Sequence, residues 1–149
     1  MATRSTIAME QPDGKILQVY CHWDGYIDNN GKILQQHYQD KAKVYALMLL
    51  GSISSLRKEI GMAHDFDARY DRDDEKAQWT VAYGRDRGEK DVDANVYKDF
   101  ADYVANHQYE EYEYVYRLDG QWHVSKYSEA YVPLADAIAA EEAEKEAAD

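Results

Sequence analysis

The residue types best suited to chemistry in this chain gather in one short run, Cys21-His22-Trp23-Asp24-Gly25-Tyr26, which His37 follows. A thiol beside an imidazole and a carboxylate could form an activated nucleophile. However, catalytic Cys–His pairs are assembled from residues far apart in the sequence, whereas neighbours on a strand point to opposite faces. We therefore predict that Cys21 is a small core residue, and we assign no catalytic residue.

The imidazoles and the carboxylate of this region could instead surround a ligand. His22, Asp24 and His37 would meet if the end of the strand folded over the following helix. Their spacing matches no zinc signature, so we predict no metal site and no cofactor. The candidate binding residues that remain are His22, Asp24, Tyr26 and His37.

The same run also has a purely structural interpretation. The carboxylate of Asp24 can accept backbone N–H groups in a turn, and Gly25 can supply a positive φ. Trp23 and Tyr26 would then hold the turn against the core. Under this interpretation Asp24→Asn costs little and Gly25→Val costs much. The alternative is an aromatic-walled pocket that binds a ligand.

A second candidate segment is Gly84-Arg85-Asp86-Arg87-Gly88, which we expect to be a polar loop before a helix. Arginines and free backbone N–H groups at such a place can hold an anion. The segment lacks the Lys and Ser/Thr of a P-loop, and nearby carboxylates cancel its charge. Arg85, Asp86 and Arg87 are therefore candidate contact residues for a partner rather than a phosphate cradle.

Composition narrows the class of protein. The chain has 149 residues, 45% of them hydrophobic, a net charge of −12 and one cysteine. This charge disfavours binding to nucleic acid or to an anionic membrane and favours a basic partner. No apolar run approaches a membrane span, and the N-terminal residues lack a secretory signal. We expect a cytosolic domain whose oligomeric state is open, a homodimer included.

Alternating polarity and turn residues predict two β-hairpins, at 3–10 with 15–23 and at 110–118 with 121–126, and a single strand at 78–83. Periodicity and capping residues predict helices at 30–38, 41–50, 91–106 and 132–148. The fold class is therefore α+β, an antiparallel or mixed sheet of about five strands packed against helices. Residues 52–61 are predicted to be a loop or single helical turn, and 64–76 an exposed connection.

Two finer predictions concern packing and domains. Leu17, Val19, Cys21 and Trp23 share one face of a strand, which we expect to be buried against the 91–106 helix. Residues 1–135 should form a single α+β domain, followed by an acidic Ala/Glu-rich helical tail at 136–149.

The strand near residue 113 carries acidic residues, which could mimic the phosphates of a DNA backbone. Tyrosines alternate with Glu111 and Glu113 along it. The simpler interpretation is an amphipathic strand with solvated glutamates. One strand does not establish a two-dimensional array of acids.

The residue pattern resembles a family of small uncharacterised proteins encoded by tailed bacteriophages and prophages. The resemblance rests on the CHWDGY run, with similar segments at 51–56, 83–89 and 106–112. It implies an accessory protein in the host cytoplasm, without functional residues. Two function classes follow. The first is a non-catalytic binder of a host or phage protein, such as a counter-defence protein or an inhibitor of a nucleic-acid-handling factor. The second is a small enzyme or ligand-binding domain that uses the Cys21–Tyr26 junction.

Overall fold

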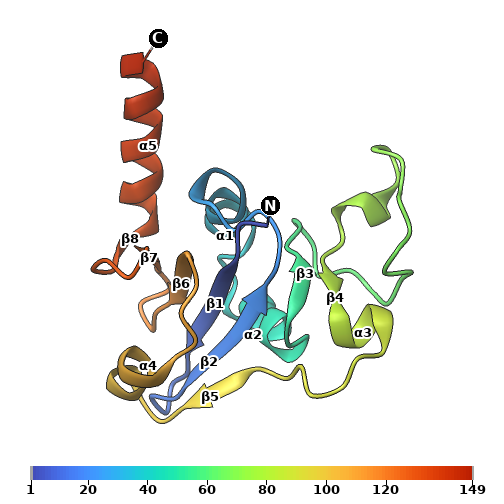
Figure 1. The fold of residues 1–149 in the computed structure, drawn as a ribbon, viewed down its shortest axis with the longest axis horizontal. Coiled ribbons are helices and arrows are strands. Elements are labelled where there is room, and N and C mark those ends of the chain that lie inside the picture. The colour runs from blue at the N-terminus through green and yellow to red at the C-terminus, as the bar shows by residue number, and fades with distance from the viewer. Residues whose placement is uncertain (1, 149) are drawn as a thin grey trace.

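The computed structural model describes residues 2–148. Met1, in the predicted domain 1–135, and Asp149, in the predicted tail 136–149, lie outside the described residues. This part of the chain forms a mixed eight-stranded sheet with helices on both faces (Figure 1). The strand order is β4-β3-β2-β1-β6-β7-β8, and β5 also pairs with β2. The strands are β1 (Ser5–Glu10), β2 (Ile16–Cys21), β3 (Ile53–Ser55), β4 (Val81–Ala82), β5 (Asn95–Tyr97), β6 (Tyr112–Tyr116), β7 (Trp122–Lys126) and β8 (Val132–Pro133). The helices are η1 (Ile27–Gly31, a π-helical turn), α1 (Lys32–His37), α2 (Lys41–Leu49), η2 (Glu75–Gln78, 3₁₀), α3 (Tyr83–Arg87), α4 (Phe100–Asn106) and α5 (Leu134–Ala148).

The α+β class is confirmed, as are both predicted hairpins, β1–β2 and β6–β7. Gly14 turns the first hairpin with φ of +92°, a conformation that favours glycine. A parallel pairing of β1 with β6 joins the two hairpins, so the first strand of the chain lies in the middle of the sheet.

The estimate of about five strands was too low, because β3, β5 and β8 were not predicted. Each has only two or three residues and shows no alternation of its own. The predicted helix at 91–106 is wrong in its first half, where β5 pairs antiparallel with Ile16–Gln18 of β2. The Val92 carbonyl accepts a hydrogen bond from Ser52 N at 2.7 Å, which holds this segment extended. Likewise, the predicted polar loop at 84–88 is mostly the short helix α3.

The main core lies between one face of the sheet and the helices α1 and α2. Val19 and Cys21 are buried in it with Leu34, Val44 and Leu47, and Leu17 packs at its margin. The prediction that this face packs against the 91–106 helix was therefore wrong. Helix α4 instead covers the opposite face, where the smaller cluster of Ala8, Ile16, Tyr103 and Val115 is buried.

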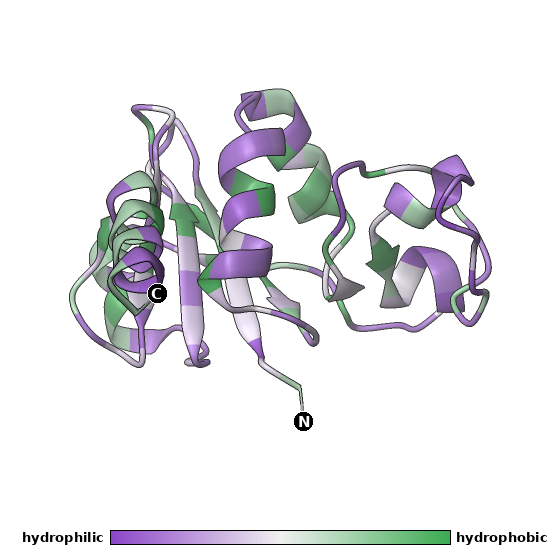
Figure 2. Cartoon of the chain, turned by 90° about the horizontal axis from the view of Figure 1, so that it is seen from above, coloured by the Kyte–Doolittle hydropathy of each residue, from purple (hydrophilic) through white to green (hydrophobic). Residues whose placement is uncertain are grey.

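Residues 57–90, here called the edge lobe, lie beside the main sheet beyond β3 (Figure 1). Most of the lobe is hydrophilic, with β4 as its hydrophobic strand (Figure 2). The predicted connection at 64–76 belongs to it and is largely irregular, with only residues 75 and 76 in η2. Helix α5 projects from the other side of the molecule and carries the C-terminal acidic residues (Figure 1).

Candidate functional site

The Cys21–Tyr26 run begins in the core and ends at the surface. Cys21 is fully buried, as predicted, and burial raises the pKa of its thiol. The Nδ2 group of Asn30 donates to Cys21 Sγ at 3.4 Å and to Ser5 Oγ at 3.3 Å. Because a nucleophilic cysteine needs an accessible thiolate, this protonated and enclosed thiol is a structural residue.

The chain reverses direction at Asp24, not at Gly25 as predicted. Asp24 has φ of +55°, whereas Gly25 is outside the positive-φ region. The Asp24 carbonyl accepts from Asn29 Nδ2 at 3.1 Å and from Asn30 N at 3.4 Å. The predicted role of the carboxylate as turn acceptor is therefore performed by the backbone, and within residues 2–148 the exposed carboxylate forms no hydrogen bond.

Gly25 is required for a different reason, namely close packing. A Cβ built at Gly25 would lie 2.6 Å from Ser5 Cβ and 3.0 Å from the Thr3 carbonyl oxygen. Gly25 N donates to that same carbonyl at 2.8 Å, and Tyr114 Oη donates to the Gly25 carbonyl at 2.6 Å. The turn is therefore fixed on the N-terminal end of β1.

His22, Trp23 and Tyr26, here called the rim, lie at the surface beside this fixed turn. Trp23 is 43% exposed and Tyr26 40%, so the prediction that Trp23 is buried was wrong. Strand β2 ends at Cys21, and the alternation of faces does not continue past it. His22 Nδ1 is hydrogen-bonded to Tyr20 Oη at 2.8 Å, and its ring meets Trp23 edge-on at 4.7 Å.

His37 ends helix α1, and its carbonyl accepts from Lys43 Nζ at 2.7 Å. Within residues 2–148, no hydrogen bond or ion pair joins the side chains of His22, Asp24 and His37. In the same part of the chain, no three His, Cys, Asp or Glu side chains are grouped so that they could hold a metal ion. These contacts therefore do not join His22, Asp24 and His37 into one polar cluster.

Arg85 and Asp86 are engaged inside the edge lobe. Arg85 donates to the carbonyls of Ile60 at 2.8 Å and Thr80 at 2.6 Å, and its Nε to Asp86 at 2.9 Å. Burial alone would raise the pKa of Asp86, but hydrogen bonds from Arg85 and from the backbone N–H groups of Ala82 and His64 lower it. These two side chains hold the lobe together, and few of their hydrogen-bonding groups remain available to a partner.

Arg87 lies on the outside of α3. Its Nε donates to Glu89 at 2.6 Å, and its guanidinium lies over the rings of Phe66 at 4.3 Å and Tyr83 at 5.0 Å. Of the three residues predicted in this segment, Arg87 is the exposed one.

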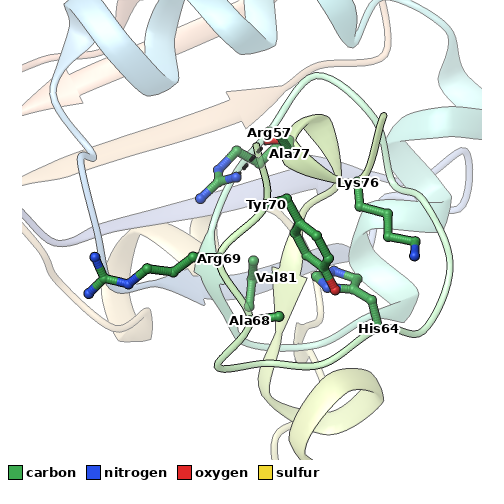
Figure 3. A pocket seen from close by; sticks show the side chains of 8 residues that line it. All are labelled: Arg57, His64, Ala68, Arg69, Tyr70, Lys76, Ala77 and Val81. Atoms are coloured by element: carbon green, nitrogen blue, oxygen red, sulfur yellow. Dashed lines mark hydrogen bonds between the residues drawn. The ribbon is translucent and has the colours of Figure 1, made fainter. Parts of the chain in front are cut away.

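The edge lobe also contains a cavity of about 300 Å³, here called the basic pocket (Figure 3). No carboxylate is among its lining residues. Arg57 Nη1 donates to the Ala77 carbonyl at 2.8 Å, which holds the guanidinium against the wall. The charged and aromatic side chains of the lining are Arg57, His64, Arg69, Tyr70 and Lys76.

His64 has a defined orientation at this pocket. Its side chain is 4% exposed, and Nε2 lies 3.2 Å from the Thr80 carbonyl oxygen and 3.6 Å from Asp86 Oδ2. A carbonyl oxygen only accepts, so Nε2 carries the proton. Nδ1 is buried and has no hydrogen-bond partner among residues 2–148.

A buried ion pair on the other face of the sheet also escaped prediction. Glu113 is 1% exposed, so its predicted solvation was wrong, and its Oε2 lies 2.5 Å from His107 Nε2. Burial raises the pKa of Glu113, and His107 offsets the rise only in part. His107 Nδ1 donates to the Tyr103 carbonyl at 2.5 Å, which fixes the orientation of the ring. The pair shares the wall of a small cavity with Ser125.

Sequence reasoning had few signals for the basic pocket and the buried pair. In the sequence, the basic residues of the pocket are mixed with acidic residues in a segment without periodicity. Only folding of the edge lobe separates the basic side chains from the acidic ones. His107 and Glu113 lie on either side of the connection between α4 and β6. Their contact becomes evident only when the position of α4 against the sheet is known.

The comparisons with known proteins add no relative. No family model, curated protein or solved structure matches the chain. The resemblance to phage proteins therefore stays a prediction. No helix within residues 2–148 has the length and apolar character needed to cross a membrane.

Proposed function

We propose that this is a non-catalytic binding protein that contacts a basic surface of another protein through the rim. The observation that carries this proposal is the exposure of Trp23 and Tyr26 on a turn that is fixed to the sheet. Exposed Trp and Tyr side chains are the residue types most often responsible for affinity at protein interfaces. A fixed turn presents them without an additional cost for ordering a loop.

Two further observations support a binder over an enzyme at this junction. The thiol of Cys21 is enclosed in the core, and within residues 2–148 no hydrogen bond or ion pair joins the side chains of His22, Asp24 and His37. The net charge of −12 favours association with a basic protein surface and opposes direct binding to DNA. In the setting implied by the resemblance, the partner is a host or phage protein in the cytoplasm of an infected cell.

The test replaces Trp23 by the photo-crosslinking residue benzoylphenylalanine and identifies the protein to which it becomes covalently attached. The same residue at Tyr45, which is also 43% exposed but lies on α2, is the matched control. We expect a product at position 23 that is absent at position 45. Trp23→Ala should then weaken binding of the purified partner at least tenfold, or about 1.4 kcal/mol.

Varying the ionic strength distinguishes long-range attraction between charges from the direct contact at the rim. Raising ionic strength from about 0.05 to 0.5 M should slow association, because charges are screened over roughly 10 Å at 0.1 M. Identical crosslinks at both positions, or tight binding to duplex DNA at moderate salt, would refute the proposal.

A further inference from the structure

We propose that the basic pocket of the edge lobe binds a small molecule through a phosphate group. The proposal is independent of the rim, because the two sites share no residue. It rests on the charge of the lining, on the unpartnered nitrogen of His64 and on the size of the cavity.

The charge at this place is unusual for the molecule. The chain carries 29 acidic and 17 basic residues, yet the pocket lining contains Arg57, Arg69 and Lys76 and no acid. Within residues 2–148, none of these three side chains forms an ion pair with a carboxylate. Gathering three cations costs energy unless an anion is present, so the lining matches an anionic ligand.

The chemistry of the lining favours phosphate among anions. The Nη1 bond of Arg57 to the Ala77 carbonyl fixes its guanidinium, and the planar fork of arginine matches two oxygens of one phosphate. Lys76 adds a point charge and lies with its Nζ 5.6 Å from the centre of the Tyr70 ring. Figure 3 shows Arg57, Arg69 and Lys76 on different sides of the cavity, with the guanidinium of Arg69 extending away from the rings of Tyr70 and His64.

His64 provides the second, independent observation. A buried polar atom without a partner is unfavourable, so the unpartnered Nδ1 indicates a group that a ligand can satisfy. Nε2 is already committed to the Thr80 carbonyl and faces Asp86, so Nδ1 is left as a hydrogen-bond acceptor. Nδ1 would accept a hydrogen bond from a phosphate group that keeps one proton, or from a hydroxyl or amino group of the attached organic part.

The size of the cavity points to more than an inorganic ion. At about 300 Å³ it lies at the lower end of the range for small-molecule sites. The Tyr70 ring on its wall offers a surface for an attached organic ring. A polymer such as DNA would be repelled by the negative charge of the whole protein surface, whereas a small phosphate compound fits within the basic pocket.

The experiment measures binding by calorimetry at low salt, with pyrophosphate, adenosine monophosphate and adenosine as probes. We expect saturable binding of both phosphate compounds with dissociation constants below about 1 mM, and none of adenosine. Arg69→Glu combined with Lys76→Glu should weaken binding at least tenfold. The matched control, Lys58→Glu combined with Arg72→Glu, changes the net charge equally at exposed positions outside the lining and should change affinity less than threefold.

A readout at His64 distinguishes the pocket from general attraction of anions. The ¹⁵N shift of Nδ1 should move on titration with pyrophosphate, and Trp23→Ala should leave that titration unchanged. The proposal is overturned if neither phosphate compound binds, if the control pair loses as much affinity as the pocket pair, or if Nδ1 does not respond. Binding of a phosphoserine peptide at least tenfold tighter than that of either small phosphate would also overturn it, in favour of a protein ligand.

Discussion

Gly25→Ala tests whether steric packing, rather than backbone conformation, fixes the turn that carries the rim. The added methyl group would lie 2.6 Å from Ser5 Cβ and 2.7 Å from Ser5 Oγ. Ser5 is fully buried in β1, so its Cβ can move only with the central strand of the sheet. We expect a loss of about 3 kcal/mol, the upper end for overpacked sites, and a fall in melting temperature of roughly 6–12 °C.

Urea denaturation followed by tryptophan fluorescence measures this loss. Gly14→Ala is the matched control, because Gly14 has φ of +92° but nothing within 4 Å of an added Cβ. That substitution should cost about 1–2 kcal/mol from backbone strain alone. Adding Ser5→Gly to Gly25→Ala should restore at least about 1 kcal/mol relative to the sum of the single variants. Equal costs for Gly25→Ala and Gly14→Ala, with no restoration by Ser5→Gly, would refute the steric explanation.

Two further predictions concern the core and the last helix. Trp122→Phe removes the donor to the Tyr38 carbonyl, a buried 2.8 Å bond, and should cost about 2–3 kcal/mol in a urea titration; an unchanged midpoint would contradict it. Hydrogen bonds from Lys145 and Lys32 lower the pKa of Asp28 from 3.8 to about 2, so the stabilisation they give is present above pH 3.8 and is lost as the pH falls through about 2. The difference in urea midpoint between the wild type and Lys145→Ala should therefore vanish over that pH interval, and a difference that persists below it would contradict the assignment.

The sequence was informative where local pattern and tertiary structure agree. The hairpin signals at Gly14 and Gly120 were sufficient, because an alternating strand on each side of a glycine turn has few other solutions. The helix predicted at 41–50 is also confirmed as α2, where the side chain of Asp40 caps the first turn by accepting from Ala42 N.

Prediction failed where a distant partner decides the outcome. Val96 fits a helical stripe, yet it lies in β5 because the edge of β2 is open to it. Glu113 follows the alternation of an amphipathic strand, but His107 and α4 cover the face that was expected to be solvated. In the candidate site, sequence located the Cys21–Tyr26 junction and missed the basic pocket, which exists only once the edge lobe has folded.

The parallel pairing of β1 with β6 has a consequence for how the chain acquires its structure. Ser5 is paired with Tyr112 and Met9 with Tyr116, so the middle of the sheet closes only after most of the polypeptide has been synthesised. Until then the outer edge of β1 exposes unpaired backbone groups, which are a template for association with other chains. Closing so long a loop costs entropy before any contact repays it, so folding should be slow for the size of the protein. A ribosome stalled before residue 112 would therefore present an N-terminal hairpin that is prone to aggregation, and the emergence of β6 is the step that protects it.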